Sequence, residues 1–204
     1  MPVEKSLPTP QKFSRRTTIK PVTFLLCSLP VVLAIYAVSQ NNLGANPIEG
    51  LLLLTGEWGL RFLLITLAVT PLQFIFRWSW IATLRRMLGL FAFSYGVLHM
   101  LIWLVLDQNL DWSSVISEII EKKYIAVGFI ALIGLLPLAL TSNRWSIRKL
   151  GRKWKPLHRL VYPLTLLVIV HFLWQVKAND IIEPAMYLVV LLLLLAWRLR
   201  KMLS

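Results

Sequence analysis

Three histidines are the side chains of this sequence most suited to chemistry, and all three lie in or beside strongly apolar segments. His99 and His171 lie inside two different apolar segments, and His158 lies at the start of the segment that contains His171, directly after a basic loop. Polar groups within a membrane are costly and are candidates for function by default. A neutral imidazole is also a common metal ligand. The three side chains are therefore candidate ligands, with a hydrogen-bonded packing role as the alternative.

The composition places these histidines in a membrane protein. Of the 204 residues, 57% are hydrophobic, and the mean hydropathy is +0.69. This is more apolar surface than one soluble domain of this length can bury. The net charge of +13 comes from short clusters of basic residues between apolar runs. A nucleic-acid-binding protein would instead gather its basic residues on one soluble face, so the charge does not indicate nucleic-acid binding. The single cysteine, Cys27, can form no internal disulfide, and no internal repeat is visible.

Six apolar segments are long enough, or nearly so, to cross a membrane as helices. They are residues 22–38, 51–76, 87–106, 124–140, 157–176 and 185–197. We therefore predict an all-α protein: a polytopic membrane helical bundle of six transmembrane helices over residues 21–204, after a flexible cytoplasmic tail of residues 1–20. An alternative for the first segment is a signal peptide, since basic residues precede it and the small residues Ala37 and Ser39 end it.

The segments between the spans are polar. Residues 40–50, 77–86 and 141–156 are predicted to be loops. Residues 107–123 differ, because apolar side chains recur there at helical spacing, which predicts an amphipathic helix on the outer surface: Trp112, Val115, Ile116, Ile119 and Ile120.

The distribution of basic residues predicts the orientation. With both termini in the cytoplasm, 18 of the 22 Lys and Arg residues lie on the inner side, as the positive-inside rule requires. Eight of the nine acidic residues then lie on the outer side. The most basic stretch, residues 144–159, is expected to set topology and contact lipid, with docking of a soluble electron donor as the alternative.

This orientation gives two of the histidines a matched depth. His99 lies 13 residues after Arg86, and His171 lies 16 residues after Lys155. Each is therefore about 20 Å along its helix from the inner edge. Two imidazoles at one depth on parallel helices are what a bis-histidine haem requires, because its iron takes one axial ligand from each face. The pair predicts an outer-leaflet haem.

His158 is placed differently, at the inner edge of the membrane. At its depth the third span carries arginines and no histidine. On a straight helix His158 would point about 140° away from His171, although Pro163 lies between them and can kink or re-phase the helix. We therefore do not expect the two to share one haem.

Arg61 is the most unusual charge within a predicted span. It follows Glu57 by four residues, the favourable order for a helical ion pair, and we expect this pair at the outer interface. The functional alternative is that Arg61 contacts a haem propionate or a quinone headgroup.

The sequence gives less support to cofactors other than haem. Zinc and copper sites need three or four ligands, which the cysteine and carboxylates do not supply at the right depth. The sequence contains neither GxGxxG nor a Walker motif, so a nicotinamide-linked electron source must be another protein, unless a membrane quinol is the donor. Trp103, Phe172 and Trp174 are candidates to line the haem region, with interfacial anchoring as the alternative for the tryptophans.

A series of short motifs carries a family resemblance. In order, they are LGANP at 43–47, LTG at 54–56, LL at 63–64, TPL at 70–72, RRMLGL at 85–90, LH at 98–99, LG at 150–151, LH at 157–158, VY at 161–162 and HFLW at 171–174. Together they resemble the MsrQ (YedZ) family, the haem-binding membrane subunits of a protein-methionine-sulfoxide reductase system within the ferric-reductase-like transmembrane superfamily. The resemblance covers residues 40–200.

The resemblance implies an electron conduit in the bacterial inner membrane. The family takes electrons from the quinone pool, has been associated with FMN, and passes electrons through b-type haem to MsrP, a periplasmic molybdopterin partner that reduces methionine sulfoxide in envelope proteins. His99, His158 and His171 match the three haem-associated histidines of the family. FMN is implied by the resemblance alone, since no flavin motif is visible.

Two other functions stay open at this point. One is a stand-alone transmembrane ferric reductase fed by a cytoplasmic flavoprotein. The other is a haem-free transporter or assembly factor in which the histidines pack or relay protons.

Overall fold

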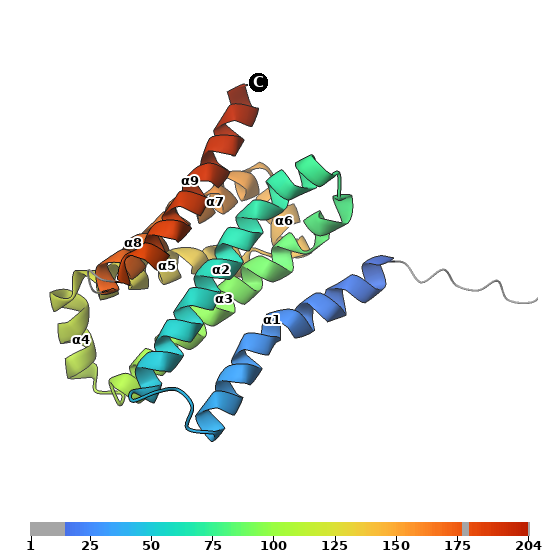
Figure 1. The fold of residues 1–204 in the computed structure, drawn as a ribbon. Coiled ribbons are helices and arrows are strands. Elements are labelled where there is room, and N and C mark those ends of the chain that lie inside the picture. Colours follow the sequence, from blue (N-terminus) through green and yellow to red (C-terminus); the bar gives the residue numbers. More distant parts are fainter. Residues whose placement is uncertain (1–14, 177–179, 204) are drawn as a thin grey trace, which may run out of the picture.

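The computed structural model describes residues 15–176 and 180–203, and every regular element within them is a helix (Figure 1). This confirms the all-α prediction. The elements are α1 Arg15–Ser39, α2 Pro47–Phe76, η1 Ser79–Thr83, α3 Arg85–Ile102, the π-helical η2 Trp103–Asp107, α4 Trp112–Glu121, α5 Lys123–Leu140, α6 Arg144–Leu150, η3 Gly151–Lys153, α7 Trp154–Arg159, α8 Val161–Gln175 and α9 Ile182–Leu203.

Six of the described segments are long and apolar enough to cross a membrane, as predicted. They are Ile19–Ser39, Pro47–Phe76, Arg85–Asp107, Lys123–Leu140, Arg144–Gln175 and Ile182–Lys201. Large apolar side chains cover their outer faces, Leu25 at 69% exposure for example, as expected for helices surrounded by lipid. The side of the membrane on which the termini lie stays a prediction.

Several predicted boundaries were wrong. Residues 1–14 of the predicted tail lie outside the described residues, but α1 already begins at Arg15. The segment 141–156 is mostly helical, because the Asn143 side chain accepts a hydrogen bond from the Ser146 N–H and caps α6. α2 begins at Pro47 after an Asn46 cap, within the predicted loop 40–50. The sequence composition marked these segments as polar, but local capping makes them helical.

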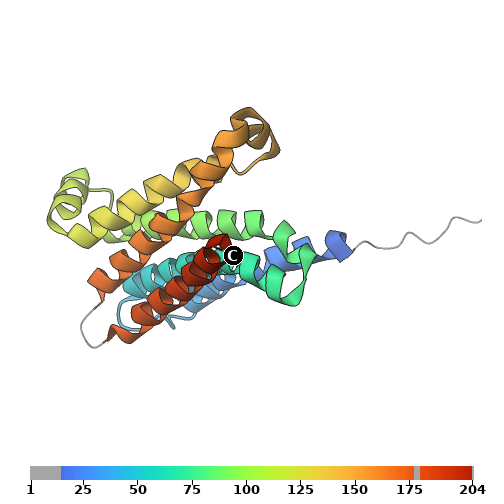
Figure 2. The ribbon, with the colours of Figure 1, turned by 90° about the horizontal axis from the view of Figure 1, so that it is seen from above.

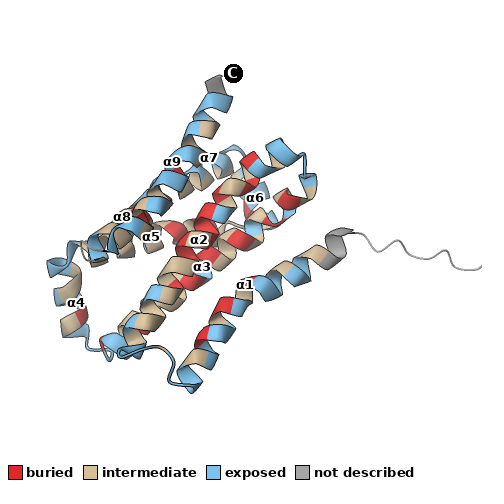
Figure 3. Cartoon of the chain, in the orientation of Figure 1, coloured by how far each residue is buried: buried red, intermediate tan, exposed pale blue. Residues whose placement is uncertain are grey.

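Two helix pairs form the bundle. α2 packs along α3, and α5 packs along α8, while α9 lies against α2 and α8. Figure 1 shows α1 to one side of the α2–α3 pair, and Figure 2 shows the α6–α7 segment projecting beyond the end of α5 and α8. Buried residues concentrate on α2 and α3, whereas α1 is largely exposed (Figure 3). α1 is held partly by the Tyr95 hydroxyl, which donates to the Cys27 carbonyl at 2.9 Å.

The fifth span is interrupted between α7 and α8. Pro163 lacks an N–H, so it cannot continue the ladder of helical hydrogen bonds back to Arg159. α7 ends at Arg159, and the Leu160 carbonyl accepts the first bond of α8 from Leu164. His158 and His171 thus belong to different helices, and the straight-helix angle between them does not apply.

Candidate functional site

His99 of α3 and His171 of α8 meet inside the bundle. Their ring centroids are 6.1 Å apart, and the ring planes are nearly perpendicular, at 86°. Each lies near the carboxyl end of its helix. The structure therefore confirms that the two histidines predicted at one depth face each other.

Each of these imidazoles is fixed by a backbone carbonyl of the neighbouring helix. His99 Nδ1 lies 2.9 Å from the Leu52 oxygen in α2, and His171 Nδ1 lies 2.7 Å from the Tyr124 oxygen in α5. A carbonyl oxygen can only accept, so we assign the hydrogen to Nδ1 in both rings. In the neutral imidazole the other nitrogen, Nε2, then carries a free lone pair. This is the usual arrangement of a metal-binding histidine, whose second nitrogen is held by a protein acceptor.

A glycine gives each histidine its space. Gly56 follows Leu52 by four residues, and Gly128 follows Tyr124 by four. A Cβ built on Gly56 would lie 3.2 Å from His99 Nδ1, and one built on Gly128 only 2.7 Å from His171 Nδ1. Any larger residue at Gly128 would displace the ring.

The two histidines are supported in the same way, each by a carbonyl and a glycine of the neighbouring helix. Leu52 lies 47 residues before His99, and Tyr124 lies 47 residues before His171. The second carbonyl, glycine and histidine each lie 72 residues after the first. The α2–α3 pair and the α5–α8 pair thus present an imidazole in the same way. No repeat is visible in the sequence by itself, and neither glycine was predicted to lie beside a histidine. The one available signal was a glycine 43 residues before each of the two histidines.

A cavity of about 260 Å³ lies between the two helix pairs, and both histidines line it. Its wall is mainly apolar, and Trp103 and Phe172 belong to it, as expected. Trp174 does not, and its side chain is 57% exposed. The polar residues of the wall are Glu57, Asp107, Glu118, Lys122, Tyr124 and Gln175.

The distance between the rings can be tested against haem iron. A metal–imidazole bond is about 2.0 Å long, and the centre of a five-membered ring with bonds of about 1.33 Å lies about 1.1 Å from its nitrogen. Two imidazoles on opposite sides of one iron would therefore have centroids about 6.3 Å apart. The observed 6.1 Å agrees with this separation. The separation of the two rings is therefore compatible with both histidines holding one haem iron.

The end of the third span is shaped by a π-helical turn. η2 begins at Trp103, immediately after the helix that carries His99, and the Gln108 N–H donates to the Trp103 carbonyl at 2.9 Å. Such turns are frequent at functional sites. Here the first and last residues of the turn, Trp103 and Asp107, both reach the cavity wall.

His158 lies away from this cavity, near the α6–α7 end. Its ring stacks on Trp154, with centroids 4.0 Å apart and planes 25° apart. Its Nδ1 is 3.3 Å from the Trp154 carbonyl, and its Nε2 is 3.5 Å from Ser142 Oγ. The structure does not bring His158 together with His99 or His171.

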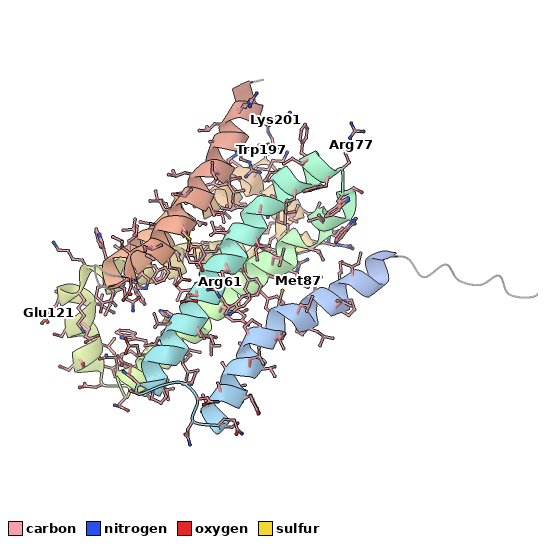
Figure 4. The ribbon with its side chains drawn as sticks, in the orientation of Figure 1. Arg61, Arg77, Met87, Glu121, Trp197 and Lys201 are labelled. Atoms are coloured by element: carbon pink, nitrogen blue, oxygen red, sulfur yellow. The ribbon has the colours of Figure 1, made fainter. Side chains whose placement is uncertain are left out.

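Arg61 forms the predicted ion pair and two further polar contacts. Its guanidinium lies 2.7 Å from the Glu57 carboxylate, 3.2 Å from that of Glu183, and donates through Nε to the Tyr187 hydroxyl at 2.8 Å. The two α9 partners were missed, because contacts between distant helices cannot be predicted from helical spacing. Arg61 lies 14 residues inside α2, and not at its end (Figure 4). Since Glu57 lines the cavity, this network adjoins the histidine pair.

The chain has relatives among known proteins. Residues 55–169 match a family described as ferric reductase like transmembrane component. The chain is similar to proteins named protein-methionine-sulfoxide reductase heme-binding subunit MsrQ. One from Azospira oryzae is 45% identical over 94% of this chain and 81% of the relative. Those from Bordetella pertussis and Rhodospirillum rubrum are 44% and 46% identical, over 88% and 86% of this chain and 88% and 85% of the relatives. No solved structure matches.

Proposed function

Because the chain belongs to the MsrQ family of haem-binding subunits of protein-methionine-sulfoxide reductases, we propose that it carries electrons across the bacterial inner membrane. The donor is the membrane quinone pool. The acceptor is MsrP, a periplasmic molybdopterin subunit that reduces methionine sulfoxide in oxidised envelope proteins. Sulfoxide chemistry takes place on that partner, and this chain is the electron-transfer subunit.

The observation that carries this proposal is the His99–His171 pair. A bound b-type haem supplies one-electron redox chemistry. His99 and His171 would hold it through Nε2, while the Leu52 and Tyr124 carbonyls keep each ring in the required tautomer and orientation. The apolar cavity wall would exclude water and provide a low dielectric around the site.

Further assignments belong to the same proposal. His158 is the candidate ligand of a second, inner haem. Arg61 is the candidate contact for a haem propionate or a quinone headgroup, because its guanidinium adjoins Glu57 in the cavity wall. FMN is included through the family resemblance alone, and we assign no residue to it.

A second candidate function is a stand-alone ferric reductase fed by a cytoplasmic flavoprotein. The match to the ferric-reductase-like family favours it. The two functions differ in the acceptor. A stand-alone reductase would reduce ferric chelates without a periplasmic partner, whereas the proposed subunit would deliver electrons to MsrP.

The test is the visible spectrum of detergent-purified protein, oxidised and dithionite-reduced, with haem quantified per polypeptide. We expect a low-spin b-type spectrum in the wild type, and its loss in both His99→Ala and His171→Ala. In His158→Ala we expect the spectrum of this pair to persist, with a fall in haem content if a second site exists. A colourless wild type, expressed with ample haem, would refute the proposal and favour a haem-free transporter or assembly factor.

A further inference from the structure

An open groove lies between the carboxyl-terminal parts of α2 and α9. It has a volume of about 710 Å³ and is lined by Thr70, Gln73, Phe74, Ile75, Arg77 and Trp197. Its apolar side chains are exposed, with Phe74 at 58% and Ile75 at 60%, and the Phe74 and Trp197 rings contact each other at 5.8 Å. None of these residues lines the cavity of the histidine pair.

Three cations surround the groove. Lys201 Nζ lies 3.8 Å from the centre of the Phe74 ring, and Arg198 donates to Thr70 Oγ1 at 3.1 Å. Arg77 is exposed and ends α2 in a left-handed conformation, with φ at 56°, at a position where glycine or asparagine is usual. Figure 4 shows Arg77, Trp197 and Lys201 together at one end of the molecule.

These cations have no carboxylate partner among residues 15–176 and 180–203. The three ion pairs found there involve Arg61 and Lys122, which lie elsewhere. The charged neighbours that act on Arg198 are Arg85 and Arg159, so they repel it. The Nε of Arg85 is buried and has no hydrogen-bond partner in the described part of the chain. An anion from outside the chain would supply the negative partner that Arg77 and Lys201 lack among the described residues.

We propose that the groove binds one anionic phospholipid. Its phosphate contacts Arg77 and Lys201, and its acyl chains lie against Phe74, Ile75 and Trp197. Cations at the end of a spanning helix attract anionic headgroups, and exposed apolar side chains beside them match the start of the acyl region. A soluble anion would contact the cations but not the apolar side chains of the groove. A phospholipid would contact both, so it is the ligand that the groove fits best.

The test is native mass spectrometry of the full chain, delipidated in a neutral detergent and titrated with dioleoyl-phosphatidylglycerol or dioleoyl-phosphatidylcholine. We expect the anionic lipid to be retained preferentially. Each cation near an anionic headgroup changes binding by about fivefold, so Arg77→Gln with Lys201→Gln should weaken phosphatidylglycerol binding by about 25-fold. Arg77→Lys with Lys201→Arg keeps both charges and should keep the preference.

The matched control removes two exposed cations outside both the groove and the basic stretch 144–159, Lys20→Gln with Arg86→Gln. It should bind phosphatidylglycerol like the wild type. Equal weakening in the control and groove variants would overturn the proposal, because the attraction would then be a property of the whole basic surface. Competition by millimolar inorganic phosphate as effective as that by the lipid would also overturn it, since the site would then hold a soluble anion. A monodisperse elution profile shows that each variant is folded.

Discussion

Replacing Gly128 by alanine should disable the proposed haem site by displacing His171. The new Cβ would lie 2.7 Å from Nδ1, 2.9 Å from Cε1 and 3.1 Å from Cγ of that ring. Non-bonded heavy atoms are in good contact at about 3.5 Å, so the ring must retreat by about 0.8 Å. A retreat of this size along the 2.7 Å hydrogen bond to Tyr124 would stretch it to about 3.5 Å, at the limit of a hydrogen bond.

The loss of such a supporting contact typically lowers metal affinity by about 10- to 100-fold. Gly56→Ala should have a much smaller effect, because its Cβ would lie 3.2 Å from His99 Nδ1 and a retreat of about 0.3 Å leaves the hydrogen bond intact. The assay is a haem titration of the apoprotein, followed by visible absorption, for both variants.

Gly134→Ala is the matched control. It places a Cβ against Leu164 Cδ2 in the same helix as Gly128, so it overpacks α5 without touching a histidine. We expect it to lower the melting temperature but to keep haem affinity. The Tyr124 carbonyl does not position His171 for haem if Gly128→Ala binds haem as tightly as the wild type. The same holds if Gly134→Ala loses as much haem affinity as Gly128→Ala.

Three further predictions concern other parts of the molecule. Arg61→Ala should lower the melting temperature by about 3–6 °C, because it leaves two carboxylates unpaired in a partly exposed network; exposed Arg148→Ala, measured in parallel, should change it by less than about 1 °C. The hydrogen bond from Lys122 to Glu118 raises the pKa of Lys122, so its stabilisation is complete below the lysine's unfolded-state pKa and is lost only as the pH rises through the folded-state pKa. Thermal unfolding of wild type and Lys122→Met should therefore differ by a constant amount between pH 6 and pH 9, and a difference that disappears within this range would contradict the assignment. The positive-inside rule predicts a cytoplasmic carboxyl terminus, so a fluorescent protein fused there should fluoresce, and a phosphatase that is active only in the periplasm should be inactive when fused there. The opposite pattern would contradict the predicted orientation.

The sequence allowed the spans and the histidine pair to be predicted for physical reasons. Apolar length determines whether a helix can cross a membrane, and a constant rise per residue converts sequence position into depth. His99 and His171 could therefore be matched before any contact was known. The ion pair of Arg61 with Glu57 was predicted in the same way, from positions four apart on one helix.

Other features depend on contacts between distant helices and could not be predicted. Nothing near Gly128 in the sequence indicates that an imidazole from α8 packs against it. The carbonyls of Leu52 and Tyr124 are backbone groups, so the residue types at these positions carry no signal. The helical character of residues 144–156 was missed because their polar, basic composition favours a loop, whereas the cap at Asn143 starts α6 there.

The duplicated histidine support has a consequence for the assembly of the protein. Each helix pair packs more extensively within itself than against the other, and each contributes one imidazole. An iron bound by both would add a cross-link between two halves that already share buried apolar clusters and the contacts of α9. Haem binding would then stabilise the assembled chain, because both histidines can bind one iron only in the state in which the two halves are together. Without haem the chain would keep its helix pairs and their shared buried clusters, but its assembled state would lack the stabilisation that ligand binding adds.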